Sequence, residues 1–177
     1  MDNTIVIGLV VALIVVGAIA VWLFMQKRQT ERLQERFGPE YENTIRSEGD
    51  RARAEKALEA RQERVEQLNI RPLSSGERDQ FAERWRQTQA RFVDDPTNAT
   101  READGLVGEV MQARGYPMGD FQQRAEDISV NHPDVVQHYR AAHDIALRNR
   151  DGDGNTEELR TAFTHYRALF DDLLEVE

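Results

Sequence analysis

Four histidines are the residues of this chain best suited to bind a metal ion or to move a proton near neutral pH. They are His132, His138, His143 and His165. A zinc pair on one helix needs a spacing of four residues, but His138 and His143 are five apart, about 140° around a helix. A site between His138 and His165 on facing helices would need an acid such as Asp144 or Asp171. The spacing alone favours surface or capping roles.

Two of these histidines begin a repeated pattern. His138-Tyr139-Arg140-Ala141 recurs 27 residues later as His165-Tyr166-Arg167-Ala168. On adjacent helices the two tyrosines would occupy equivalent places at the edge of the core, with their hydroxyls toward a polar partner. The candidate residues for a small-ligand or metal-dependent site are therefore His138, Tyr139, His165 and Tyr166.

The acidic segment 149–155 has part of the pattern of a calcium-binding EF-hand loop, which needs a bidentate acid at its twelfth position. Counting from Asn149, the twelfth residue is Arg160, and counting from Asp151 it is Ala162. Neither frame completes a calcium site, so we interpret the segment as an acidic turn. The chain also has no cysteine, no nucleophile elbow, no phosphate loop and no glycine-rich dinucleotide turn. We predict no enzyme, no cofactor and no resident metal.

The residues that follow position 25 have the apolar periodicity of α-helices, and no segment alternates like a strand. Ser74 and Glu77 form a predicted capping box at the start of a helix with Phe81, Trp85, Thr88 and Phe92 on one face. Further helices are expected over about 97–114 and 120–128, from Asn131-His132-Pro133, and from a second predicted capping box of Asn155 and Glu158. We predict an all-α fold with an antiparallel helical bundle over residues 71–177.

Residues 4–25 are 22 residues without a charge, which form about 33 Å of helix, enough to cross a hydrocarbon layer of about 30 Å. Trp22 lies near the end of this segment, where an indole ring suits the headgroup region. A cleavable signal peptide is the alternative, because Ala18-Ile19-Ala20 has the small-x-small cleavage pattern. The chain begins Met-Asp-Asn, however, without the basic start of a signal peptide. We therefore predict that residues 1–25 are an uncleaved transmembrane anchor.

The orientation of this anchor follows from its flanking basic residues. None precedes it, whereas Lys27, Arg28, Arg32 and Arg36 follow it. We expect the N-terminus outside the cell and residues 26–177 in the cytoplasm. If Ala20 is instead a cleavage site, the domain is secreted or extracytoplasmic.

The juxtamembrane segment 26–70 is charged and carries an apolar stripe in which Leu33, Phe37, Tyr41 and Ile45 step by four residues. This stripe is the candidate contact surface for a protein partner, provided that the bundle leaves it free. A second stripe within 50–68 consists of Ala54, Leu58, Val65 and Leu68. Whether residues 26–70 form a free stalk or pack on the bundle stays open at this point.

Several segments along the chain carry a family resemblance. They are Arg-Leu-Gln-Glu-Arg-Phe-Gly-Pro-Glu-Tyr (32–41), Arg-Gln-Glu-Arg-Val-Glu (61–66), Arg-Pro-Leu-Ser (71–74), Ala-Arg-Phe-Val-Asp-Asp-Pro (90–96), Ser-Val-Asn-His-Pro (129–133), and Thr-Glu-Glu-Leu-Arg with His-Tyr-Arg-Ala-Leu-Phe (156–170). With the apolar segment, they resemble a family of bacterial single-span membrane proteins without an assigned activity, some of them labelled secreted. The resemblance implies no functional residue. Only Lys27 and Lys56 among the 23 basic residues are lysines, a bias typical of GC-rich bacterial genomes.

These observations lead to two hypotheses of different classes. A net charge of −9 argues against nucleic acid as a partner. The first hypothesis is a membrane-tethered helical module that acts by contact with another protein or with a second copy of itself. The alternative is a small-ligand or metal-dependent activity in the bundle.

Overall fold

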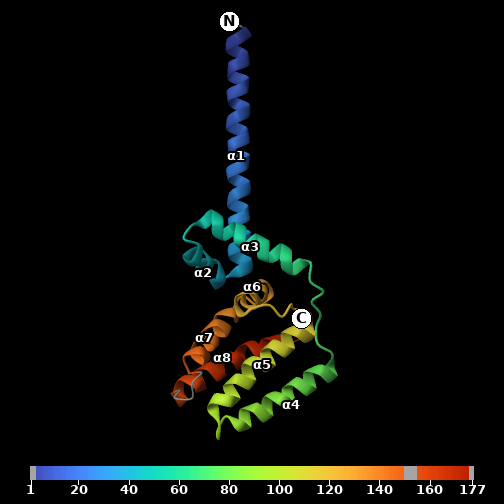
Figure 1. Ribbon diagram of the computed structural model, residues 1–177. Helices are drawn as coiled ribbons and strands as arrows, with labels where there is room; N and C mark the ends of the chain where they lie inside the picture. The colour runs from blue at the N-terminus through green and yellow to red at the C-terminus, as the bar shows by residue number, and fades with distance from the viewer. Residues whose placement is uncertain (1–2, 150–154, 176–177) are drawn as a thin grey trace.

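The computed structural model describes residues 3–149 and 155–175, and all secondary structure within these ranges is α-helical, which confirms the predicted class. The helices are α1 (Asn3–Phe37), α2 (Pro39–Glu48), α3 (Arg51–Glu66), α4 (Ser75–Arg91), α5 (Pro96–Arg114), α6 (Phe121–Asn131), α7 (Val136–Arg148) and α8 (Thr156–Leu174). The predicted acidic turn at 150–154 lies outside the described residues. Figure 1 shows α1 as a long rod that projects from a body formed by the other helices.

The apolar segment and the juxtamembrane residues belong to the same helix, α1, which runs without interruption to Phe37. One helix of the described chain, α1, is long and apolar enough to cross a membrane, and its apolar window is not buried against the rest of the protein. The end of α1 is different, because Leu33 and Phe37 are fully enclosed by other helices. The projecting rod is therefore rooted in the core of the body.

The stripe predicted as a partner-contact surface is buried, and this corrects the expectation. Gly38, at φ 45°, turns the chain so that α2 folds back beside α1, with Pro39 as its first residue. The side chains of Leu33, Phe37 and Tyr41 then pack against α3 and α6, with Ile45 partly buried beside them. Residues 26–70 are thus packed on the bundle through α3 and α6 and do not form a free stalk.

Helices α4 to α8 form the bundle, with α8 packed against both α5 and α7, and α4 against α5. The predicted inward face of α4 is confirmed, since Trp85 stacks on Phe170 with ring centroids 4.5 Å apart and contacts Phe163 at 5.0 Å. The capping box of Ser74 and Glu77 is present. Gly115 ends α5 in the left-handed conformation at φ 100°.

Two predicted helix starts differ from the structure. Asn155 caps α8 by accepting a hydrogen bond from the backbone N–H of Glu157 at 3.0 Å. The Glu158 carboxylate does not complete a capping box, because it accepts from the Asn149 side-chain amide at 2.9 Å. The helix expected from residues 131–133 begins only at Val136, because α6 itself continues to Asn131.

Candidate functional sites in and around the bundle

The first candidate site is the histidine pair, which the packing of α7 against α8 brings together, although the sequence spacing favoured surface or capping roles. The Nδ1 atoms of His138 and His165 lie 2.8 Å apart, so one ring donates a hydrogen bond to the other. Burial and the neighbouring His138 lower the pKa of His165. Within the described residues, no group of three or more histidine and acidic side chains is placed to hold a metal ion. The pair can therefore share a proton, but it is not a preformed metal centre.

The tyrosines of the repeated pattern lie on a different face of the same two helices. Tyr139 and Tyr166 are fully buried, with ring centroids 6.3 Å apart in an edge-on arrangement. The four residues predicted as one polar site are thus divided, because consecutive residues on a helix point about 100° apart. The histidines meet at the half-buried edge of the bundle, and the tyrosines meet in its core.

The tyrosine hydroxyls were expected to have a polar partner, yet neither makes a hydrogen bond of normal geometry. Burial, and after it the negative charge of Asp104, raise the pKa of Tyr139 and of Tyr166. Oδ1 of Asp104 and Nε of Arg124 are buried without hydrogen bonds as well. Four helices therefore contribute one polar group each to a cluster in the core, namely Asp104 from α5, Arg124 from α6, Tyr139 from α7 and Tyr166 from α8.

A cavity of about 170 Å³ leads to this cluster, because Asp104 is one of the residues that line it. The other polar lining includes Thr97, Thr100, Arg101, His143 and Asn149. At about 30 Å³ per water molecule, the cavity holds about six waters or a ligand of a few heavy atoms. A carboxylate acceptor beside a guanidinium donor suits a small polar molecule that offers both hydrogen-bond donors and acceptors.

Sequence reasoning missed Asp104, although a signal was present. Asp104 lies four residues after Thr100 and four before Gly108, and both of these residues are buried. On a helix these positions share one stripe, so the Asp104 carboxylate lies on a face of α5 whose other residues are buried. An acid within an inward-facing stripe is either paired or functional.

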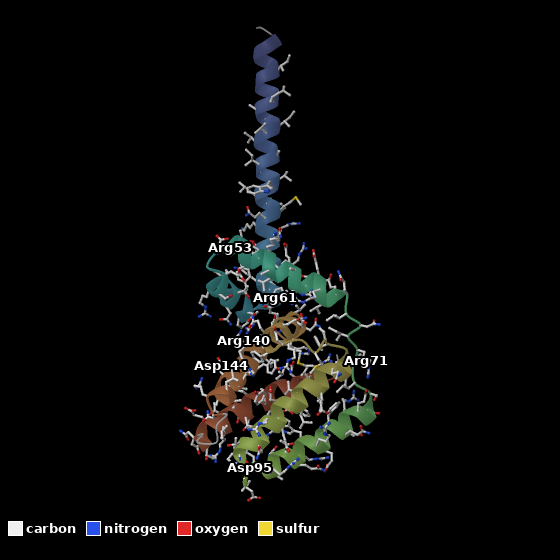
Figure 2. The ribbon with its side chains drawn as sticks, viewed as in Figure 1. Arg53, Arg61, Arg71, Asp95, Arg140 and Asp144 are labelled. Carbon is white, nitrogen blue, oxygen red and sulfur yellow. The ribbon has the colours of Figure 1, made fainter. Side chains whose placement is uncertain are left out.

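A second buried polar network joins the root of α1 to the bundle, and its centre is Glu40. The Glu40 carboxylate, only 1% exposed, accepts hydrogen bonds from Arg61 of α3 at 2.9 Å and from Arg140 and Gln137 of α7, each at 2.7 Å. Figure 2 shows Arg61 and Arg140 at the junction between α3 and the bundle. Beside it, Arg64 of α3 donates to the fully buried Asp127 of α6 at 2.7 Å.

The electrostatics of this network favour an ionised Glu40. Burial alone would raise the pKa of Glu40, but the hydrogen bonds and charges of Arg140 and Arg61 outweigh burial and hold the pKa below 4.5. The consecutive helices α2 and α3 and the distant helix α7 thus share one buried charge. The network links α2 and α3 to α7 of the bundle and so holds the root of α1 in place.

Of the predicted anchor and topology residues, Trp22 lies near the end of the apolar segment, and Lys27 and Arg28 lie between this segment and the buried root of α1. Trp22 is exposed, Lys27 pairs with Glu31 at 3.7 Å, and the Arg28 guanidinium lies 4.5 Å from the centre of the Phe24 ring. These positions are compatible with the headgroup region at the end of a membrane span.

Comparison with known proteins adds no relative to these observations. No family model, no curated protein and no solved structure matches this chain. The function therefore has to be argued from the geometry of the chain itself.

Proposed function

We propose that this chain is a single-pass membrane protein that holds a helical domain at a fixed position against the membrane surface, where the domain acts as a protein-interaction or structural module. The observation that carries the proposal is the continuity of α1, which passes from an exposed apolar segment into the buried core without a linker. Leu33 lies eight positions after Met25, which is about 12 Å along a helix. The domain therefore begins close to the end of the apolar segment.

The orientation proposed for the domain is cytoplasmic. Basic residues follow the apolar segment and none precedes it, a distribution that favours retention of the following residues on the cytoplasmic side. An extracytoplasmic domain, released by cleavage after Ala20, is the competing arrangement. It would separate the domain from the greater part of the helix in which it is rooted.

Partner contacts of the domain have to use its polar surface, because the apolar stripe of α1 and α2 is buried. Outside the apolar segment, the exposed large hydrophobic side chains of the described chain are Val93, Met118 and Leu147. They come from three separate parts of the sequence, and single exposed apolar residues are common on soluble domains. The partner is therefore a protein with a complementary charged surface or a second copy of this chain.

Two measurements test the proposal. Reporter fusions at each end, combined with alkaline extraction of membranes and N-terminal sequencing, should give an uncleaved, membrane-retained chain with only its C-terminal reporter active in the cytoplasm. Cross-linking of the full chain in membranes should then give a specific adduct with a partner or with itself. A chain that is cleaved after Ala20, or one that forms no adduct above background, would refute the anchored interaction module.

A second candidate function is the binding of a small polar ligand in the Asp104 cavity. It is favoured by the unpaired buried groups of Asp104, Tyr139 and Tyr166, because such groups cost free energy unless a partner satisfies them. Native mass spectrometry of the purified full chain should detect a retained small molecule that Asp104→Asn releases. A matched change at an exposed carboxylate, Asp79→Asn, should retain it. A ligand-free wild-type chain would refute this candidate.

A further inference from the structure

We propose that the corner between α1 and the beginning of α3 binds the phosphate headgroup of an anionic phospholipid. The inference rests on the proposed membrane anchor and adds to it a defined binding site for the lipid. A cavity of about 510 Å³ lies at this corner. It is lined by Leu23, Gln26, Lys27 and Thr30 of α1, and by Asp50, Arg51, Ala52 and Glu55 at the start of α3.

The depth of this cavity matches the headgroup layer of a bilayer. Its α1 lining begins at Leu23, inside the apolar segment, and ends at Thr30, five residues beyond Met25. At 1.5 Å per residue the cavity reaches about 8 Å past the end of the apolar segment. The headgroup layer on each side of a bilayer is about 5–8 Å thick. A lipid phosphate would lie at this level, with its acyl chains beside Leu23.

The basic side chains at this corner are available for an anion. Arg51, Arg53 and Lys56 lie in the first two turns of α3, are exposed, and form no ion pair within the described parts of the chain. Lys27 lines the cavity from α1 and has only a weak contact, at 3.7 Å, with exposed Glu31. Figure 2 shows Arg53 at the edge of the body beside the apolar helix.

The acidic residues that line the cavity are occupied by internal hydrogen bonds. The Asp50 carboxylate caps α3 by accepting from the Arg53 backbone N–H at 3.0 Å. The Glu55 carboxylate accepts from Tyr41 at 2.7 Å and from Thr30 at 2.8 Å. Burial and this hydrogen bond to Glu55 raise the pKa of Tyr41 to about 12, so the phenol keeps its proton. Both carboxylates keep their negative charge, but the four basic side chains at the corner, Lys27, Arg51, Arg53 and Lys56, outnumber them, which favours an anionic ligand over a cationic one.

The direction in which α3 faces supports the same ligand. Its buried residues, including Ala54, Leu58 and Val65, pack toward α1, α2 and α6. Lys56 is on the opposite face, away from the bundle. In Figure 1, α3 crosses α1 between the projecting rod and the bundle, so the start of α3, with Arg51 and Ala52, lies beside the end of the apolar segment. The acidic residues Glu63 and Glu66 lie in the second half of α3, away from the cavity.

The experiment uses the full chain in detergent micelles and dansyl-labelled phospholipids as probes. Trp22 lies beside the cavity and can transfer excitation energy to a bound dansyl group, whereas the second tryptophan, Trp85, is buried in the bundle. Dansyl-phosphatidylglycerol should bind more tightly than dansyl-phosphatidylcholine, more weakly as salt is added, and without competition from inorganic phosphate. Equal binding of the two lipids, or displacement by inorganic phosphate, would overturn the inference.

Charge removal provides the second arm of the experiment. The variant R51Q/R53Q/K56Q should bind dansyl-phosphatidylglycerol about 100-fold more weakly, because each basic residue at a lipid surface contributes about fivefold. The control R86Q/R148Q/R160Q removes the same charge from exposed positions on α4, α7 and α8 and should bind within about twofold of the wild type. The single variant R51Q removes the charge of the arginine that lines the cavity, with an expected loss of about fivefold. It covers the case in which circular dichroism shows that the triple variant is misfolded. Unchanged binding by either corner variant contradicts the inference.

Alkaline extraction of reconstituted vesicles separates failure of this inference from failure of the anchor. A chain that stays in the bilayer but does not distinguish the two lipids refutes only the headgroup site. A chain that is extracted refutes the anchor, and with it the site.

Discussion

Replacing Glu40 by glutamine tests whether the buried network holds the root of α1 on the bundle. The change keeps the size of the side chain and one carbonyl acceptor, but it removes the negative charge shared by Arg61 and Arg140. Arg61 is nearly inaccessible, with 7% of its side chain exposed, and Arg140 has 23% exposed. Arg140 would then lie in a poorly solvated site without a full counter-charge, and Arg61 would keep its longer contact with Glu126 at 3.5 Å.

The size of the effect follows from this burial. Removing one partner of a buried ion pair costs about 3–5 kcal/mol, because the remaining charge is left unpaired. Glutamine still accepts one hydrogen bond, so we expect about 3 kcal/mol. For a chain of this length each kcal/mol lowers the melting temperature by about 2–4 °C. Glu40→Gln should therefore lower it by about 6–12 °C.

The assay is thermal unfolding of the full chain in detergent, followed by circular dichroism, with hydrogen exchange to locate the loss of protection in α2 and α3. The matched control is Glu109→Gln, which removes an exposed partner of Arg84, with side chains 49% and 48% exposed. Exposed pairs contribute about 1 kcal/mol or less, so the control should shift the transition by less than about 4 °C. Equal shifts for the two variants would refute the reasoning.

The dependence of stability on pH is an independent test of the charge on Glu40. Because the pKa of Glu40 is lowered in the folded state, its stabilisation is complete above the unfolded-state pKa of about 4.3 and is lost as pH falls through the lower folded-state pKa. The difference between the wild type and Glu40→Gln should therefore be full at pH 6 and shrink steadily below about pH 4.3. A difference that stays constant down to pH 3 would contradict an ionised Glu40.

Three further variants have defined expectations. His165→Gln should reduce the loss of stability that the wild type shows in thermal melts as pH falls below about 6.5, because a histidine with a lowered folded-state pKa stabilises only when neutral; equal acid sensitivity would contradict this. Gly115→Ala should destabilise by more than about 1 kcal/mol in chemical unfolding, because φ is +100° and the added Cβ would lie 2.6 Å from the backbone oxygen of Asn69. In the control, Gly76→Ala, the added Cβ has no neighbouring atom within 4 Å, so the free energy of unfolding should change little. Tyr166→Phe removes a buried hydroxyl that makes no hydrogen bond of normal geometry and faces the charge of Asp104, so it should leave the melting temperature unchanged or raise it; a loss above about 1 kcal/mol would show that the hydroxyl forms a stabilising hydrogen bond.

The buried faces of the helices were predictable from the sequence, because apolar residues spaced three or four apart mark the side of a helix that packs inward. The stripe through Trp85 on α4 is buried as expected, and the stripe through Leu58 on α3, whose burial the sequence left open, is buried as well. The cap at Ser74 and the helix end at Gly115 were predictable for a similar reason, since each depends on residues within one turn. These signals are local, and a single sequence contains them in full.

Contacts between distant elements were not predictable in the same way. Glu40 and Arg140 are 100 residues apart, and nothing in either neighbourhood indicates the other. The burial of Phe37 and Tyr41 depends on how α2 folds back toward α3, which the periodicity of their stripe does not specify. Glu158 was assigned to a cap because that partner is close in sequence, but the amide of Asn149 occupies its carboxylate. Local patterns cannot decide between two competing partners.

The uninterrupted course of α1 gives the proposed membrane protein a mechanical property. No proline interrupts the helix, and no glycine lies between Gly17 and Gly38, so bending is not concentrated at any point between the bilayer and the core. A change in tilt of about 10°, within the range found for spanning helices, would swing Phe37, about 18 Å beyond Met25, sideways by about 3 Å. The helix then acts as a lever, and the thickness of the surrounding bilayer sets the angle at which the bundle is presented.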